Sequence, residues 1–240
     1  MESKTLGLYP ADRAMFENEA YLKEVIYPDM HREYYWSSDF SPAFYIAQAK
    51  AGCIAICETI EGEEFLLPEI QRGYAILDFS DLHISKKVAR IMRKQPLQLQ
   101  LSSRLDQVAA QIHAHHRNNW LTPAYLEILQ RTEGVDPQFQ VLSVALYEEG
   151  VLVAGEIGYR IGRTYTSLSG FSSREKRYRD YGKVQMVLLA QALQKQGISF
   201  WNLGHPYMPY KTALGAKIYT RIEFLRRWYR AALGKNFDEF

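Results

Sequence analysis

The hydrophobic and polar positions of residues 1–81 predict one helix and three short strands. Ser41 is placed to cap a helix over residues 42–51, since Pro42 suits a first turn and Gly52 follows the C-terminal end. Apolar runs bounded by turn residues predict extended segments at 53–59, 64–68 and 73–79, the first two as a hairpin or extended pair around Glu61-Gly-Glu63. We interpret these elements as a small N-terminal domain, residues 1–81.

The pattern from residue 82 onward predicts a larger domain, residues 82–240, that mixes helices and strands. Residues 82–94 combine apolar with basic residues and indicate a strand end followed by a short basic helix. At the centre we expect a hairpin with Glu149-Gly150 in its turn. The predicted strands are 97–101, 141–147 and 151–161, and the predicted helices are 105–116 and 123–132.

The run that begins at Tyr165 is the most informative part of the chain. An apolar strand end at 165–172 leads into a basic loop and then a predicted helix over 184–196. A buried strand is predicted at 198–204, and residues 205–216 place aromatic and imidazole rings among prolines and glycines. In several α/β folds, a strand, an anion-binding loop, a helix and a second strand follow one another in this order and bind an acyl donor through its phosphate group. We therefore expect a ligand pocket here.

Composition excludes several classes of protein. With 240 residues, of which 47% are hydrophobic, the chain can bury a substantial core and is not expected to be disordered. It has no run of about 18 apolar residues and no basic segment followed by an apolar one at its start, so we expect a cytoplasmic protein without a membrane span. Cys53 and Cys57 lack a second cysteine pair or nearby histidines, and we expect reduced core residues.

Positive charge is concentrated in one loop. The net charge of +2 is too small to indicate a nucleic-acid-binding protein by itself. Residues 174–183 nevertheless hold five basic against two acidic residues, next to a predicted helix start whose amide groups favour phosphate. A solvated loop with local ion pairs explains the same pattern, so both interpretations stay open. The five cations are Arg174, Lys176, Arg177, Arg179 and Lys183.

Short motifs along most of the chain occur in an order shared with a known family. They are Asp39-Phe-Ser-Pro-Ala43 with Gly52, Arg72 ahead of Leu82-His-Ile-Ser-Lys86, Asn119-Trp-Leu-Thr122, Leu152-Val-Ala-Gly155 with Gly158, Ser169-Gly-Phe-Ser172, Lys183, and Leu214-Gly-Ala216 with Arg221. In these motifs the chain resembles the bacterial leucyl/phenylalanyl-tRNA-protein transferases. The resemblance implies an α+β fold, with a small N-terminal domain and a C-terminal mixed sheet flanked by helices of the N-acetyltransferase (GNAT) type.

The same resemblance implies an activity. Members of the family move an amino acid from a charged tRNA to the N-terminus of an acceptor protein, a modification connected with protein degradation. The implied partners are therefore an aminoacyl-tRNA and an acceptor protein or small amine, with no cofactor and no metal. We expect a monomer.

Roles at individual positions also follow from the resemblance. Trp120 falls where the family has a tryptophan near the terminal adenosine of the tRNA, and stacking of a base on an aromatic ring contributes about 1 to 3 kcal/mol. The residues implied around the aminoacyl group are Trp120, Glu156, Tyr165, Leu168, Ser169, Gly170, Phe171, Leu189 and Trp201. Those implied at the reacting groups are Asn202, Gly204 and His205, and the five cations above are assigned to tRNA phosphates.

Several of these positions depart from the family's pattern. The family's Glu-Ser-Met-Phe run is Leu168-Ser-Gly-Phe171 here, and its Ile-Asp-Cys-Gln run is Trp201-Asn-Leu-Gly204. A methionine that lines the family's side-chain pocket falls at Glu156. Burying an unpaired carboxylate costs several kcal/mol, whereas burying a leucine side chain returns only about 1.5 to 3 kcal/mol. If Glu156 faces the pocket, a polar or cationic aminoacyl group fits better, and we hypothesise an altered donor specificity.

Other reactive side chains have simpler interpretations. His113, His115 and His116 lack an acidic or cysteine partner for a metal site, and we interpret them as surface or tRNA-facing residues. Ser169 and Ser172 lack a histidine and an acid in an arrangement that would make a nucleophile, so strand-end packing is favoured.

The aromatic-rich turn leaves alternatives open. His205 at a strand end suits acyltransferase chemistry and equally suits a ring packed in a turn beside Pro206 and Tyr207. Tyr210 is interpreted as a packed aromatic residue and Lys211 as a surface lysine. Two alternative functions also remain: an acyl-CoA-dependent N-acyltransferase, with Arg179-Asp-Tyr-Gly182 as an imitation of its pyrophosphate loop, and a catalytically inactive tRNA-binding relative.

Overall fold

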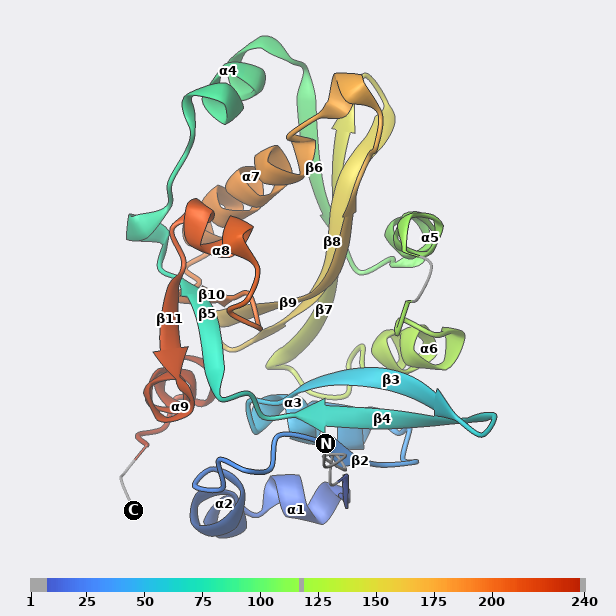
Figure 1. The fold of residues 1–240 in the computed structure, drawn as a ribbon, viewed down its shortest axis with the longest axis vertical. Helices are drawn as coiled ribbons and strands as arrows, with labels where there is room; N and C mark the ends of the chain where they lie inside the picture. The colour runs from blue at the N-terminus through green and yellow to red at the C-terminus, as the bar shows by residue number, and fades with distance from the viewer. Residues whose placement is uncertain (1–7, 117–118, 238–240) are drawn as a thin grey trace, which may run out of the picture.

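The protein has an α+β fold built around one seven-stranded mixed sheet (Figure 1). The computed structural model describes residues 8–116 and 119–237. The strand order is β11-β5-β10-β9-β8-β7-β6, in which β9 and β10 are parallel and the other neighbours are antiparallel. The strands are β5 (Gly73–Leu77), β6 (Leu97–Ser102), β7 (Phe139–Glu148), β8 (Val151–Ile161), β9 (Thr164–Ser172), β10 (Phe200–Asn202) and β11 (Lys217–Thr220). The α+β class and the mixed sheet predicted from the sequence are confirmed.

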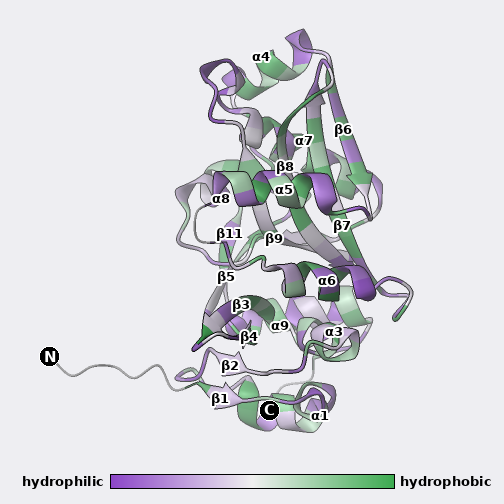
Figure 2. Ribbon diagram, turned by 90° about the vertical axis from the view of Figure 1, so that its right-hand side faces the viewer, coloured by the Kyte–Doolittle hydropathy of each residue, from purple (hydrophilic) through white to green (hydrophobic). Residues whose placement is uncertain are grey.

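Helices cover both faces of this sheet. Helix α7 (Tyr181–Lys195) connects the parallel strands β9 and β10 and packs on one face together with α4 (Lys86–Lys94). Helix α5 (Asp106–His115) packs on the other face against β7, β8 and β9, and α6 (Pro123–Arg131) lies next to it, both in front of the sheet in Figure 2. Each face has its own hydrophobic core, so the sheet is buried on both sides between helices.

The central hairpin forms where the turn residues predict it. Glu149 and Gly150 both have positive φ angles, +48° and +80°, as a two-residue turn of the type that suits twisted strands requires. One strand later, the register of β8 and β9 shifts between Ile157 and Gly158. A Cβ at Gly158 would lie 2.5 Å from the carbonyl oxygen of Thr166 and would also overlap the Tyr165 hydroxyl, so this position requires glycine.

The N-terminal part of the chain forms a smaller layer below the large sheet (Figure 1). The predicted helix is α3 (Pro42–Lys50), whose cap is confirmed by a 3.2 Å hydrogen bond from the Phe44 amide to Ser41 Oγ. The predicted hairpin is β3 (Ile54–Ile60) and β4 (Glu63–Glu69). The remaining elements are β1 (Tyr9–Pro10), α1 (Arg13–Glu17), α2 (Glu19–Tyr21), a π-helical turn η1 (Leu22–Ile26) and β2 (Tyr35–Trp36).

Strand β5 differs from its predicted grouping. The sequence pattern groups residues 73–79 with the N-terminal domain, but β5 pairs with β10 and β11 inside the large sheet. Periodicity identifies a strand without identifying its partners, because pairing between strands distant in sequence is not a local property. The division at residue 82 stays a proposal, and on these pairings a boundary would fall before Gly73.

Some boundaries and elements of the C-terminal half also differ from the sequence expectations. Helix α7 begins at Tyr181, which agrees with a helix start at Asp180 or Tyr181 beside the basic loop and lies three residues before the pattern over 184–196. Asp180 precedes it in a left-handed conformation with φ of +74°. The predicted turn at 205–216 contains the short helix α8 (Pro209–Leu214). The other elements after β5 that the sequence pattern did not predict are η2 (Phe79–Asp81), η3 (Lys176–Tyr178), β11 (Lys217–Thr220), α9 (Arg221–Trp228) and η4 (Tyr229–Leu233).

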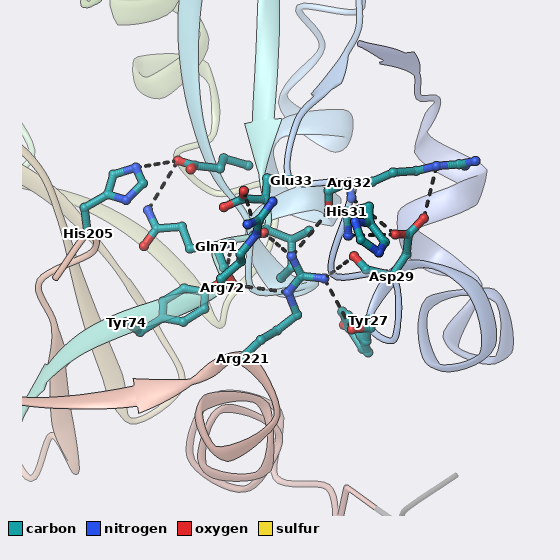
Figure 3. A network of polar contacts seen from close by, with 12 residues as sticks. Tyr27, Asp29, His31, Arg32, Glu33, Gln71, Arg72, Tyr74, His205 and Arg221 are labelled. Atoms are coloured by element: carbon teal, nitrogen blue, oxygen red, sulfur yellow. Dashed lines mark hydrogen bonds and ion pairs between the residues drawn. The ribbon is translucent and has the colours of Figure 1, made fainter. Parts of the chain in front are cut away.

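Arg221 joins the two parts of the molecule (Figure 3). Its side chain is fully buried at the start of α9, and among the described residues its guanidinium donates to backbone carbonyl groups alone. The acceptors are Ile26, Tyr27, Asp29, Arg32, Ile70 and Gln71, at distances from 2.6 to 3.5 Å. Arg221 therefore fixes the start of α9 against both the N-terminal helices and the segment between β4 and β5. Within the described ranges, no helix is long and apolar enough to cross a membrane.

Candidate functional site

A cavity of about 740 Å³ lies where strands β8 and β9, the start of α7 and helix α8 meet. Strand register explains how separate stretches reach it, since Glu156 of β8 is paired with Gly170 of β9. Eight residues predicted from the sequence line this cavity: Trp120, Glu156, Leu168, Ser169, Gly170, Phe171, Arg174 and Lys183. A smaller cavity of about 430 Å³ lies among α1, α3 and η4 and contains none of the predicted residues.

Glu156 faces this cavity and is 5% exposed. Its Oε1 accepts hydrogen bonds from the Tyr165 hydroxyl at 3.0 Å and Ser167 Oγ at 2.7 Å, and its Oε2 accepts one from Gln185 Nε2 at 3.2 Å. All three donors are neutral, and no cation among the described residues pairs with the carboxylate. Burial raises the pKa of Glu156, and the hydrogen bonds from Ser167, Gln185 and Tyr165 oppose that rise.

Gly170 lies directly across the strand pair from Glu156, at a position with little room for a side chain. A Cβ at Gly170 would lie 2.9 Å from the carbonyl oxygen of Gly155 and 3.1 Å from Cβ of Glu156. The two departures from the family's pattern are thus neighbours across one strand pair.

Three residues implied around the aminoacyl group lie behind the cavity wall instead of on it. Tyr165, Leu189 and Trp201 are fully buried in the core on the α7 side of the sheet and do not line the cavity. Tyr165 and Trp201 still act on it indirectly. Tyr165 donates a hydrogen bond to Glu156. Trp201 Nε1 donates to Ser167 Oγ at 2.8 Å, and the Ser167 hydroxyl in turn donates to the Glu156 carboxylate.

The three residues implied at the reacting groups do not line the cavity. Asn202 Oδ1 accepts a 2.9 Å hydrogen bond from the Gly204 amide, and Gly204 turns the chain with a φ of +71°. His205 then lies beside Glu69, with Nε2 2.9 Å from Oε2 (Figure 3). The short β10 ends at Asn202, and this turn directs the next residues toward β5, where the Ala75 amide donates to the Gly204 carbonyl. A catalytic role for these residues stays a prediction without geometric support.

Trp120 lines the cavity and is half-buried, with its ring edge-on to Tyr125 at 5.1 Å between centroids. His116 Nε2 lies 2.9 Å from the Gly170 carbonyl oxygen, and the Arg174 guanidinium donates to the His115 carbonyl. These contacts attach the end of α5 to β9 and to the loop that follows it. The cavity lining therefore combines a flat aromatic ring with cations, which suits a nucleotide.

The basic loop divides into two groups. Arg174 and Lys183 line the cavity, whereas Lys176, Arg177 and Arg179 do not. Local ion pairs also occur, as the solvated-loop interpretation expects. Asp180 pairs with Lys87 and, at 3.4 Å, with Lys183, and Arg177 pairs with Glu175 at 2.9 Å.

Lys211 is a cavity residue that the sequence analysis missed. It was interpreted as a surface lysine, but it is 4% exposed and lines the cavity from the first turn of α8. Its amine donates to the carbonyls of Leu203 and, at 2.7 Å, His205. Burial lowers the pKa of Lys211 to about 8. A lysine between Tyr210 and Thr212 gives no sequence signal of this, because its burial depends on how α8 folds back onto the loop after β10.

The cysteines and histidines form no metal centre within the described part of the chain. Cys53 and Cys57 are free and buried, which confirms them as core residues. The rings of His113 and His115 contact backbone carbonyls of their own helix. Among the residues that the structure describes, no three histidine, cysteine, aspartate or glutamate side chains gather closely enough to hold a metal ion.

Comparison with known proteins places this cavity in a family context. A model of the family described as leucyl/phenylalanyl-tRNA protein transferase matches residues 76–229, which include every residue lining the cavity. The chain belongs to this family. The family predicted from the sequence motifs is thereby confirmed.

Two relatives in the family show how far the chain has diverged. The leucyl/phenylalanyl-tRNA–protein transferase of Rubrobacter xylanophilus is 28% identical over 154 residues, covering 64% of this chain and 76% of that protein. The protein of the same name from Azotobacter vinelandii is 26% identical over 212 residues, covering 78% of this chain and 88% of that protein.

Solved structures with a related fold are more distant. The C-terminal domain of a putative lysylphosphatidylglycerol synthetase from Agrobacterium fabrum has a TM-score of 0.48 at 13% identity, covering 93% of this chain and 82% of that one. A GCN5-related N-acetyltransferase from Kribbella flavida has a TM-score of 0.41 at 12% identity, covering 87% and 73%.

Proposed function

We propose that the protein is an aminoacyltransferase that moves an amino acid from a charged tRNA to an acceptor amine, the N-terminus of a protein or a small amine. One observation carries the proposal. Pocket residues assigned separately from family motifs on the segment before α6, on β8 and on β9 converge on the same cavity, together with two cations of the basic loop. Family membership supports the same reaction class.

The cavity suits an aminoacyl ester that enters with its nucleotide end at the opening. Trp120 offers a face for the terminal adenine, a contact of about 1 to 3 kcal/mol. Arg174 and Lys183 line the same cavity, where they can attract backbone phosphates. The reaction breaks an ester to make an amide, and it depends mainly on positioning the amine next to the carbonyl carbon.

Glu156 gives the proposed donor a chemical character. The carboxylate lies on the cavity wall and has three neutral hydrogen-bond donors but no cationic partner among the described residues. An apolar aminoacyl group in the cavity would exclude water from this carboxylate without replacing the lost hydration, which costs free energy. A cationic or polar aminoacyl group would instead supply a charge or a further donor. We therefore propose that lysyl- or arginyl-tRNA is a better donor than leucyl- or phenylalanyl-tRNA.

The acyl-CoA alternative finds less support at the basic loop. The Gly182 amide, which a pyrophosphate group would need, donates to Ser172 Oγ at 3.1 Å. The residue at the cap of α7, Asp180, is an anion that pairs with two lysines. A bound pyrophosphate would have to displace these contacts.

A single assay separates the candidate functions. The protein is incubated with a mixture of acceptor peptides and either radiolabelled aminoacyl-tRNAs or radiolabelled acetyl-CoA. Label that moves from tRNA to peptide supports the proposal, and label that moves from acetyl-CoA supports an acyl-CoA-dependent N-acyltransferase. Binding of tRNA without any transfer supports a catalytically inactive relative and contradicts the proposal.

A further inference from the structure

We propose that Lys211 is a catalytic residue that carries the proton from the attacking acceptor nitrogen to the leaving ribose oxygen. This inference rests on the proposed function, because it assigns a role within aminoacyl transfer. It was not visible from the motifs, since Lys211 lies outside those that carry the resemblance.

The backbone holds the Lys211 amine in one place. Helix α8 starts at Pro209, so Lys211 lies in its first turn and reaches back to the loop that follows β10. The carbonyls of Leu203 and His205 accept from the amine, and Leu203 itself lines the cavity. A side chain held by two fixed acceptors is positioned before any substrate arrives.

These two bonds account for both N–H groups of a neutral amine. The remaining tetrahedral position is the lone pair, or the third proton of the ammonium form, and no further hydrogen-bond acceptor for it occurs among the described residues. No carboxylate within the described ranges forms an ion pair with Lys211, so its charged form has two carbonyl groups and the face of the Tyr210 ring to replace water. Burial thus favours the neutral form and lowers the pKa of Lys211 to about 8, which suits a base near neutral pH.

Other titratable groups surround the same space. Tyr210 is adjacent in sequence, and its ring centroid lies 6.0 Å from the Lys211 nitrogen. The His205 side chain contacts Glu69. The remaining titratable groups on the cavity wall are Glu156, Asp180, Lys183, Arg174, His115 and His116. Glu156 is held by three neutral donors and Asp180 by two lysines, so neither is positioned to take over the role of Lys211.

The proposed step balances without any further reactant. The acceptor amine attacks the ester carbonyl carbon, a C–N bond forms, and the nitrogen becomes positively charged. Lys211 takes one proton from that nitrogen and becomes an ammonium. As the bond from the carbonyl carbon to the ribose oxygen breaks, the ammonium gives the proton to that oxygen, which leaves a neutral amide, a ribose hydroxyl and a neutral lysine.

A purely structural role for Lys211 predicts different behaviour. In that case the amine only ties the 203–205 loop to α8, and Lys211→Arg would replace it, since a guanidinium also donates to two carbonyls. Arginine, however, stays protonated and cannot accept a proton. Lys211→Met removes both abilities while keeping an unbranched side chain, and Lys217→Met, on the exposed strand β11, is a matched control.

The decisive variant is Lys211→Cys alkylated to its aminoethyl thioether, which restores an amine of lower pKa. Cys53 and Cys57 are buried with raised pKa values, so they resist alkylation, and alkylated wild type checks this. Transfer is measured between pH 6 and 10 with an acceptor peptide whose N-terminal amine has a pKa far below this range, which removes the acceptor's own titration. Aminoacyl-tRNA binding and thermal unfolding are measured beside it.

We expect kcat/KM of the wild type to fall as pH drops through about 8, because the neutral amine is then lost. Lys211→Arg should bind tRNA but transfer the amino acid about 10² to 10⁴ times more slowly than wild type. The thioether variant should be active, with the acidic limb of its pH–rate profile moved to lower pH. Full activity in Lys211→Arg, or an acidic limb that does not move in the thioether, overturns the inference. Absence of transfer from tRNA by the wild type would overturn the proposed function itself.

Discussion

Replacing Glu156 by glutamine tests how the cavity selects its donor. Glutamine keeps the shape of the side chain, and its amide oxygen still accepts from Tyr165 and Ser167. The new amide group faces Gln185, whose own amide can rotate to accept. The substitution therefore removes a charge while the hydrogen bonds are conserved, so the fold should be retained.

The size of the effect follows from the geometry. A cationic aminoacyl group about 4 Å from the carboxylate gains about 4 kcal/mol at an effective dielectric constant of about 20, before the cost of desolvating the two charges. If about 2 to 4 kcal/mol remains in the transition state, Glu156→Gln should lower kcat/KM for lysyl- or arginyl-tRNA about 30- to 1000-fold. For leucyl- or phenylalanyl-tRNA, kcat/KM should stay the same or rise.

The assay is single-turnover transfer to one acceptor peptide from four separately charged tRNAs, those for lysine, arginine, leucine and phenylalanine. Wild-type preference for leucine or phenylalanine, unchanged in Glu156→Gln, would refute the reasoning. An equal fall for all four donors would also refute it, because the carboxylate would then contact the α-amino group that every donor shares. Melting temperatures of both proteins show whether a loss of activity reflects unfolding.

The same carboxylate gives a pH dependence with a defined sign. Because burial raises the pKa of Glu156, the Glu156 side chain binds a proton more tightly in the folded protein than in the unfolded chain. Its contribution to stability is fully present below the unfolded pKa and is lost as pH rises through the folded pKa. The stability of Glu156→Gln relative to wild type should therefore increase with pH, and selectivity for a cationic donor should be lost as pH falls through the same range. A difference in stability that stays constant across this range would contradict the assignment.

Three further substitutions test other parts of the account. Trp120→Ala should weaken aminoacyl-tRNA binding by about 1 to 3 kcal/mol with an unchanged melting temperature, as measured by filter binding and thermal unfolding. Arg174→Ala should reduce the slope of log affinity against log salt by up to about one unit, and an unchanged slope would exclude a phosphate contact. Arg221→Met should destabilise the protein by about 3 to 5 kcal/mol in urea unfolding, since up to six buried carbonyls lose their donor, and a loss below 1 kcal/mol would contradict its joining role.

Local features of the fold could be predicted from sequence because they depend on neighbouring residues. Ser41 caps its helix and Glu149-Gly150 turns its hairpin through contacts within four residues. The convergence of Glu156 and Gly170 followed from motifs on two strands that a short turn makes adjacent. Such contacts leave a recognisable spacing in the sequence.

Features that depend on distant pairing could not be predicted in the same way. Strand β5 joins the large sheet through partners more than 100 residues away. The direction of His205 depends on the left-handed conformation of Gly204, and the burial of Lys211 depends on a six-residue helix after that turn. Most of the candidate residues on β8 and β9 therefore line the cavity, whereas those after β10 do not, because one turn decides which side chains reach it.

The central claim is tested most directly by the mass of an acceptor peptide after incubation with the protein and charged tRNA. The account predicts a gain of one aminoacyl residue at the free N-terminus, absent when that N-terminus is acetylated and absent when acetyl-CoA replaces the tRNA. An unchanged mass with every charged tRNA would contradict it, as would an acetylated product formed from acetyl-CoA.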